Sequence, residues 1–151
     1  MPIPEFNNLS EQEVEFLVNA PAYVTILIAS ADDKIEKKEK NWAKKLVSYR
    51  SFTSEPMLQA YYEEVNKSFE TAIDALEELY NESEDGLTAI STELEKLTPI
   101  LAKLDENMSA SLLSSWRSLA HKVAEATGGF LGMFSTDNEE KKWIDLPMLK
   151  G

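Results

Sequence analysis

The chain has 151 residues, of which 43% are hydrophobic and 28% are charged, and it contains no cysteine. These proportions favour one folded domain with a hydrophobic core over a disordered tail or a disulfide-stapled miniature. The absence of cysteine excludes disulfides, thiolate metal sites and thiol nucleophiles. It also fits a reducing compartment, so we expect a cytoplasmic protein.

The chain is strongly acidic, with 27 acidic residues, 15 basic residues, a formal net charge of −12 and a pI near 4.5. Nucleic-acid binding needs clustered Lys and Arg, whereas the lysines here are interleaved with glutamates. We therefore expect a protein partner, with basic proteins, basic peptides and divalent cations as the favoured classes, and no nucleic acid. The apolar run 20–31 is shorter than the roughly 20 residues of a membrane span, so we expect none.

The first helix is predicted to begin near Glu11, after an N-terminal arm of residues 1–9. Ser10 and Glu13 have the spacing of a capping box, in which each side chain bonds the other residue's amide. Pro21 lacks an amide hydrogen, so we predict a break near Asn19 and Ala20 and a second helix that runs to about Ala31. The buried face of the second helix is predicted to contain Val24, Leu27, Ile28 and Ala31.

Two aspartates, Asp32 and Asp33, then form an acidic elbow. Asp33 and Glu36 repeat the capping spacing, so a third helix is predicted from there to Tyr49. Its apolar stripe is predicted to contain Ile35, Trp42, Leu46 and Tyr49. Residues 50–56 are predicted to be a loop.

The remainder of the chain also reads as helical. A long amphipathic helix is predicted over 57–80, a second over 87–101 with a break or kink at Thr98 and Pro99, and a third that ends at Gly128. A last helix is predicted from Ser135 or Thr136 towards Leu146. Since no stretch alternates like a β-strand, the predicted fold is all-α, as a single compact bundle of about seven helices.

Two segments of the chain resemble each other. Residues 33–42 and 135–143 both lead from a polar elbow into a Glu/Lys-rich helix, and Glu39 and Glu140 each stand three residues before a tryptophan. The similarity indicates either a weak internal repeat or two independent charged helix starts.

The acidic elbow is the candidate metal site. Asp32, Asp33, Glu36 and Glu39 are spaced so that their carboxylates could bind Ca²⁺ or another divalent cation. The simpler interpretation, which a metal site has to displace, is that they only cap the helix and complement its dipole. An EF-hand does not fit, because a loop that starts at Asp32 places Lys37 at the turn glycine and Ala43 at the bidentate glutamate.

Other catalytic chemistries lack their residue sets. A di-iron bundle needs Glu-x-x-His pairs, but Ser118 precedes His121, which is the only histidine. We expect His121 to be a partly buried structural residue. Serine nucleophiles need a base and an orienting acid, which are absent around Ser114, Ser115 and Ser118, so these serines are expected at the surface. The three tryptophans, Trp42, Trp116 and Trp143, are expected in the core.

The segment from Leu27 to Ile35, followed by Glu39, resembles the tellurite-resistance TerB-like domain family, whose signature is an apolar helix, alanine, Asp-Gly and a downstream glutamate. Residues 128–132, followed by Glu139 and Glu140, are similar to the second half of that domain. The resemblance implies a helical domain with internal pseudo-symmetry, a role in stress-response assemblies, and metal binding. The implied metal residues are Asp32, Asp33, Glu39 and Glu140. The family's usual glycine is Asp33 here, which adds negative charge.

The preferred hypothesis is a non-catalytic helical module that binds proteins, with the acidic elbow as a candidate site for a divalent cation. Two alternatives stay open. One is a metal-dependent enzyme that uses the same carboxylates, and the other is a purely structural or oligomerising helical domain.

Overall fold

The computed structural model describes residues 6–30, 37–54, 56–80, 86–128, 146 and 148–149. Apart from short turns and irregular residues, these ranges form α-helices, and they contain no strand, which confirms the all-α prediction. The helices are α1 (Glu11–Ser30), α2 (Lys37–Thr53), α3 (Pro56–Tyr80), α4 (Gly86–Glu95), α5 (Leu97–Leu101) and α6 (Glu106–Gly128). The helix predicted from residue 135 and the second segment of the proposed repeat lie outside the described residues.

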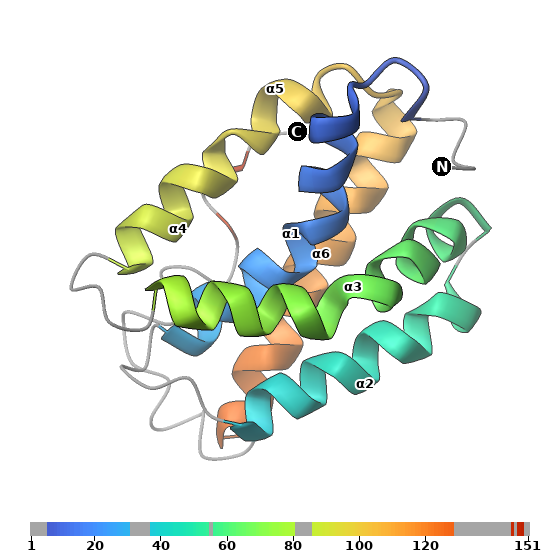
Figure 1. Cartoon of the computed structure of the whole chain (residues 1–151). Coiled ribbons are helices and arrows are strands. Elements are labelled where there is room, and N and C mark those ends of the chain that lie inside the picture. The colour runs from blue at the N-terminus through green and yellow to red at the C-terminus, as the bar shows by residue number, and fades with distance from the viewer. Residues whose placement is uncertain are drawn as a thin grey trace.

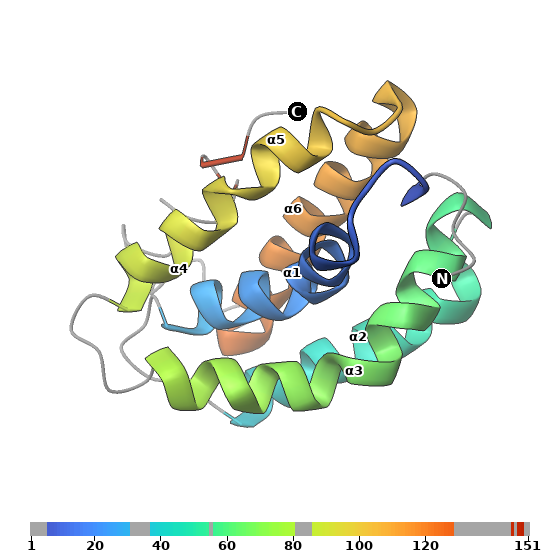
Figure 2. The same cartoon turned by 45° about the horizontal axis from the view of Figure 1, so that its top comes forward.

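The bundle is arranged around α1, which contacts each of the other five described helices (Figures 1 and 2). On one side α2 and α3 run next to each other in opposite directions. The short helices α4 and α5 line the opposite edge, and α6 lies behind α1 in Figure 1. None of the helices in the described part of the chain combines the length and apolar character needed to cross a membrane.

The central position of α1 is visible in its burial. All five residues from Val24 to Ile28 are fully buried. A helix with one solvent-exposed face would bury only every third or fourth residue, so this stretch is packed on all sides. The hydroxyl of Thr25, buried within it, donates a 2.8 Å hydrogen bond to the carbonyl of Pro21. The predicted burial of Val24, Leu27 and Ile28 is confirmed, and Ala31 lies outside the described residues.

The predicted helix break near Asn19 and Ala20 is wrong, because α1 is continuous through Pro21. Proline has no amide hydrogen, so the carbonyl of Leu17, four residues earlier, loses its helical partner. The hydroxyl of Tyr61, on α3, donates to this carbonyl at 2.6 Å. A side chain from another helix thus replaces the missing backbone hydrogen bond, and α1 can continue.

Tyr61 joins three helices and the N-terminal arm. Its fully buried hydroxyl also accepts a 3.0 Å hydrogen bond from Trp116 Nε1 on α6. The ring of Phe6 packs edge-on against it, with ring centroids 6.2 Å apart. Burial holds the pKa of Tyr61 well above its usual value, so the hydroxyl keeps the proton that it donates to Leu17.

The predicted loop over residues 50–56 is too long. The helix α2 continues to Thr53 and therefore includes Arg50. The next helix, α3, begins at Pro56, which fits the first turn of a helix because the amide there needs no helical partner.

The predicted apolar stripe of α2 is partly wrong. Trp42 and Tyr49 are 44% and 58% exposed, whereas Ala43 and Val47 are fully buried and Leu46 is partly buried. The contact face is rotated from the predicted one. The small side chains of Ala43 and Val47, one helical turn apart, let α2 approach its neighbours closely, and the large aromatic rings point outward.

The apolar positions of α3 and α6 follow the predicted helical spacing. The buried side chains are Tyr61, Tyr62, Val65, Phe69, Ile73 and Leu76 on α3, and Met108, Leu112, Trp116, Leu119 and Val123 on α6. Leu58 is partly buried against the same core. The predicted end of α6 at Gly128 is confirmed.

The interruption near Pro99 falls earlier than predicted. The helix α4 ends at Glu95, Lys96 forms a turn, and Pro99 lies inside α5. Pro99 cannot donate to the carbonyl of Glu95, four residues earlier, so the helical ladder stops there. At the junction of the two helices, the amide of Lys96 donates to the carbonyl of Glu93, three residues earlier, at 3.1 Å.

The predicted capping box at the start of α1 is confirmed. The Ser10 amide donates to Glu13 Oε1 at 2.9 Å, and the Glu13 amide donates to Ser10 Oγ at 3.1 Å. Lys103 binds the second carboxylate oxygen of Glu13 at 2.6 Å. The hydrogen bonds from Lys103 and from the Ser10 amide lower the pKa of Glu13.

We predict that Tyr61→Phe lowers the free energy of unfolding by about 1–3 kcal/mol, because it leaves the Leu17 carbonyl buried without its hydrogen-bond donor. Trp116 Nε1 also loses its acceptor. Urea unfolding followed by circular dichroism measures the change. Thr92→Val removes a hydroxyl from an exposed side chain of α4 and serves as the control, with an expected change below about 0.5 kcal/mol. Equal effects of the two substitutions would contradict the role of Tyr61.

Candidate functional site

The carboxylates predicted to bind a metal cannot be placed together. Asp32, Asp33, Glu36 and Glu140 lie outside the described residues. Glu39 belongs to the first turn of α2, but its side chain is also outside them. Among the residues that the structure does describe, no group of three acidic or histidine side chains could hold a metal ion. Cation binding at the elbow therefore stays a prediction.

Calorimetry tests this prediction. We expect CaCl₂ or MgCl₂ to give a saturable heat with the wild-type protein, and Asp32→Ala/Glu39→Ala to abolish it, because carboxylate oxygens are the ligands of hard cations. Glu63→Ala/Glu106→Ala removes two exposed carboxylates elsewhere and is the control. Absence of heat with both ions would leave the elbow carboxylates as helix-capping residues only.

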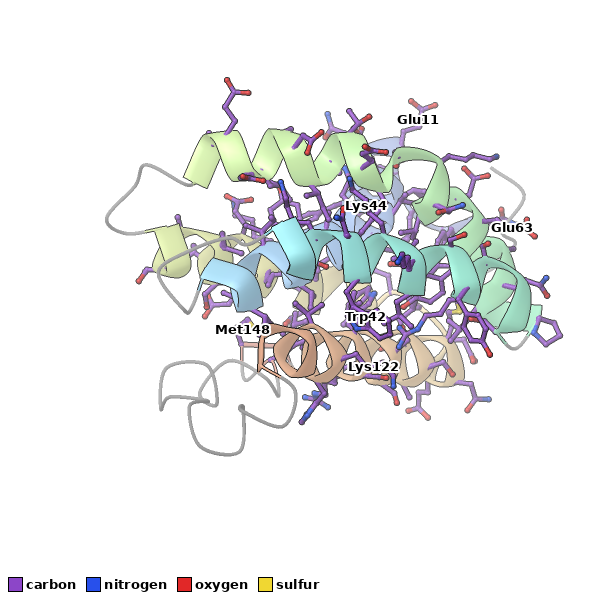
Figure 3. All side chains as sticks on the ribbon, turned by 90° about the horizontal axis from the view of Figure 1, so that it is seen from below. Glu11, Trp42, Lys44, Glu63, Lys122 and Met148 are labelled. Carbon is purple, nitrogen blue, oxygen red and sulfur yellow. The ribbon has the colours of Figure 1, made fainter. Side chains whose placement is uncertain are left out.

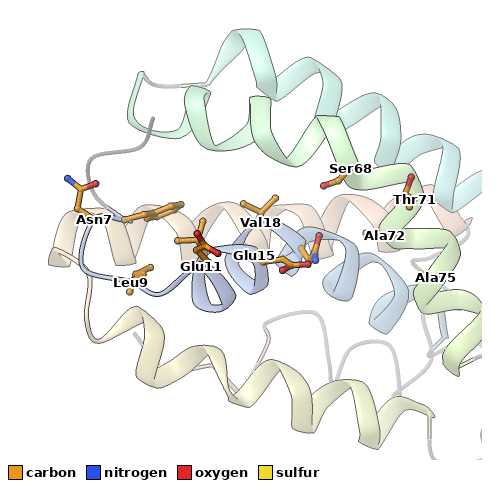
Figure 4. Close-up of a pocket in the computed structure, with 12 residues that line it drawn as sticks. Asn7, Leu9, Glu11, Glu15, Val18, Ser68, Thr71, Ala72 and Ala75 are labelled. Atoms are coloured by element: carbon orange, nitrogen blue, oxygen red, sulfur yellow. The ribbon is translucent and has the colours of Figure 1, made fainter. Parts of the chain in front are cut away.

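A groove of about 700 Å³ lies between α1 and α3 (Figure 4). Its apolar lining comes from the N-terminal arm and both helices, and consists of Phe6, Leu9, Val14, Val18, Ala72 and Ala75. Ala72 and Ala75 have small side chains, as do Ser68 and Thr71 beside them on α3. The α3 side of the groove therefore does not fill the space between α1 and α3.

The two charged residues in the described lining of the groove are acidic. Glu11 and Glu15 project from successive turns of α1, and both are exposed. The described lining contains no Lys or Arg, and α1 as a whole carries none. The groove therefore combines an apolar floor with a negative rim.

Basic residues are instead gathered on α2. This helix contains six basic residues and one acidic residue, whereas its neighbour α3 contains six acidic residues and one basic residue. Lys44 lies on the side of α2 that faces α3 (Figure 3) and binds Glu70 at 3.1 Å, and Lys40 binds Glu77 one turn further along. Ion pairs thus help to hold the two helices in their antiparallel arrangement.

Arg50 ties α2 to both α3 and α6. Its Nη1 donates to the Tyr62 hydroxyl at 3.0 Å and to the Ser115 carbonyl at 2.9 Å. Its Nη2 donates to Ser118 Oγ at 3.0 Å, and the guanidinium carbon lies 5.4 Å from the centre of the Tyr62 ring. These contacts surround a second, smaller cavity of about 380 Å³.

Tyr62 is the buried member of this cluster. Its hydroxyl donates to Ser115 Oγ at 2.9 Å, and Ser115 Oγ donates in turn to the Leu112 carbonyl at 2.8 Å. Burial raises the pKa of Tyr62, and the charge of Arg50 partly opposes that rise. The phenol therefore stays neutral, and the hydrogen-bond acceptors around the Arg50 guanidinium are neutral groups.

The other residues singled out in the sequence on α6 have mixed outcomes. Ser114 is exposed as predicted, but Ser115 and Ser118 are half-buried and bonded in the Arg50 cluster. His121 is exposed rather than partly buried, because the core face of α6 runs through positions on either side of it. Trp116 is fully buried as predicted, and Trp143 lies outside the described residues.

Sequence reasoning missed both hollows. A signal for the groove existed in the small residues Ser68, Ala72 and Ala75, which share one face of α3 at helical spacing. A signal for the second cavity existed in Ser111, Ser114 and Ser118, which share one face of α6. Neither pattern says which helix lies opposite, so neither could define a site by itself.

Comparisons with protein-family models, with curated proteins and with solved structures found no match for this chain. The described helices and the groove between α1 and α3 define an all-helical protein with a candidate binding groove.

Proposed function

We propose that this protein is a non-catalytic interaction module, and that the groove between α1 and α3 accepts the apolar face of a basic amphipathic helix from a partner protein. The observation that carries the proposal is the chemistry of the groove. An apolar floor flanked by two glutamates matches a helix with apolar side chains on one face and lysines or arginines beside them.

The lining of the groove supports a helix as the occupant. The small residues of the α3 wall allow a backbone to come close, as in other helix-in-groove complexes. Leu79 is 66% exposed and follows Ala72 and Ala75 at helical spacing, so it extends the apolar side of α3 by one turn. Exposed apolar surface that continues a groove is typical of an interaction surface.

Charge supports a basic partner. Glu11 and Glu15 lie at the groove, and the net charge of −12 on the whole chain attracts cationic partners and repels acidic ones. Such long-range attraction raises the association rate more than it raises the final affinity.

The resemblance to the TerB-like family supports the same proposal. It suggests a cytoplasmic module of a stress-response assembly, with an internal repeat and a cation at the acidic elbow. The alternative of a metal-dependent enzyme needs a cation at the same elbow carboxylates. Absence of heat with both ions in the calorimetry described above would therefore count against this alternative as well.

A designed helical peptide of leucine and lysine tests the proposal. Its leucines are placed at i, i+3, i+4 and i+7, and fluorescence anisotropy measures its binding. We predict that Ala75→Trp abolishes binding, because the indole would occupy the groove. We also predict that Glu11→Lys/Glu15→Lys weakens binding at least about fivefold, since two exposed charge pairs of about 0.2–1 kcal/mol each become repulsive.

The control for charge is Glu63→Lys/Glu106→Lys, which changes the net charge equally at exposed sites outside the groove. It should weaken binding less than twofold at physiological salt. Equal weakening by both double variants would mean that the peptide binds the acidic surface in general. A concentration-dependent dimer abolished by Ala75→Trp would assign the groove to a second copy of the chain and contradict the proposed partner.

A further inference from the structure

The guanidinium of Arg50 has hydrogen-bonding capacity that its protein contacts do not use. A guanidinium has five N–H donors, and three of them are taken by the Tyr62 hydroxyl, the Ser115 carbonyl and Ser118 Oγ. Within the described ranges, Nε–H and the second hydrogen of Nη2 have no acceptor. Two donors on a fixed, half-buried side chain are therefore left for another molecule.

The charge of Arg50 is also without a counter-ion in the described part of the chain. Its acceptors are a phenol, a backbone carbonyl and a serine hydroxyl, all of which are neutral. In contrast, Lys40 and Lys44 on the same helix are paired with glutamates of α3. In a protein of net charge −12, a half-buried cation without a carboxylate is unusual and favours an external anion.

The cavity beside Arg50 is lined with hydroxyl groups. It occupies about 380 Å³, and the lining residues with hydroxyls are Ser54, Ser111, Ser114, Ser115, Ser118 and Tyr62. Ser118 Oγ accepts a hydrogen bond from Arg50, so its own hydrogen is free to point into the cavity. The hydroxyls of Ser111 and Ser114 form no hydrogen bond within the described residues. No carboxylate belongs to the lining that the structure describes.

We propose that this cavity binds a phosphate group. Phosphate has three or four oxygens around one centre, so it can accept from the two remaining guanidinium donors and from the hydroxyls of Ser111, Ser114 and Ser118 together. A carboxylate has only two oxygens and would leave most of these hydroxyls without a partner. Arginine is the residue best suited to such bidentate contacts with phosphate oxygens.

The phosphate can belong to the free inorganic ion or to a phosphorylated side chain of another protein. The cavity is formed by α2, α3 and α6, whereas the proposed helix-binding groove is formed by α1, α3 and the N-terminal arm. The two sites share no lining residue. One site can therefore fail its test without affecting the test of the other.

NMR titration of the ¹⁵N-labelled full chain with sodium phosphate tests the proposal, with sodium chloride at matched ionic strength as the reference. We expect saturable shifts of the amides of Ser111, Ser114 and Ser118 and of the Arg50 Nε–H signal. We also expect the double variant Ser111→Ala/Ser114→Ala to weaken binding at least about threefold. Ser48→Ala/Ser91→Ala, which removes two serine hydroxyls outside the cavity, is the matched control and should leave binding unchanged.

A second variant, Arg50→Lys, keeps the charge but loses the planar fork. We expect it to weaken phosphate binding at least tenfold, which corresponds to 1.4 kcal/mol. Its urea unfolding curve shows whether the variant folds. If it does not fold, the serine variants show whether the cavity binds phosphate. A phosphoserine peptide that binds tighter than inorganic phosphate would assign the site to a modified protein, and the reverse order would assign it to the free ion.

Three results would overturn the proposal. The first is a set of shifts that chloride reproduces at the same ionic strength. The second is acetate binding as tightly as phosphate, and the third is unchanged phosphate affinity in both Arg50→Lys and Ser111→Ala/Ser114→Ala.

Discussion

The structure depends on how the protein satisfies one backbone carbonyl. Pro21 lies in the middle of α1, just before the stretch from Val24 to Ile28 that is buried on all sides, and its missing amide hydrogen leaves the Leu17 carbonyl without a helical partner. No water is needed there, because the Tyr61 hydroxyl donates at 2.6 Å and Trp116 Nε1 donates to the same hydroxyl. A buried carbonyl left unpaired would cost about 1–3 kcal/mol, a large part of the stability of a small domain. The Tyr61 hydroxyl, which compensates for the proline, thus connects α1, α3 and α6.

The two adjacent tyrosines of α3 contact different helices. Tyr61 points to the centre of the bundle and holds α1, while Tyr62 packs against it with ring centroids 5.0 Å apart and meets Arg50 of α2. Both candidate binding hollows are lined partly by α3, the cavity by Leu58 and Tyr62 and the groove by residues between 68 and 75. The groove receives its acidic residues from α1, and the hydroxyl-lined cavity receives its cation from α2. The same acidic chain therefore has one surface suited to a cationic partner and another suited to an anion.

Local signals in the sequence predicted most of the helices, since capping residues and apolar spacing act over only a few residues. The box formed by Ser10 and Glu13 is an example, and so is the end of α6 at Gly128. The failures came from long-range contacts. The break predicted near Pro21 does not occur because its compensating partner, Tyr61, stands forty residues later in the chain. The outward rings of Trp42 and Tyr49, and the Arg50 cavity, likewise depend on which helix packs opposite, and a single helical pattern does not contain that information.

The most direct test of this account is a double-mutant cycle between Pro21→Ala and Tyr61→Phe, measured by urea unfolding. Alanine at position 21 restores the amide that can bond the Leu17 carbonyl, so the Tyr61 hydroxyl should no longer be essential there. The account predicts that Tyr61→Phe lowers the free energy of unfolding by about 1–2 kcal/mol less in the Pro21→Ala background than in the wild type. The unpaired Trp116 Nε1 contributes equally in both backgrounds and cancels. An equal effect of Tyr61→Phe in both backgrounds would contradict the claim that its hydroxyl replaces the missing proline amide.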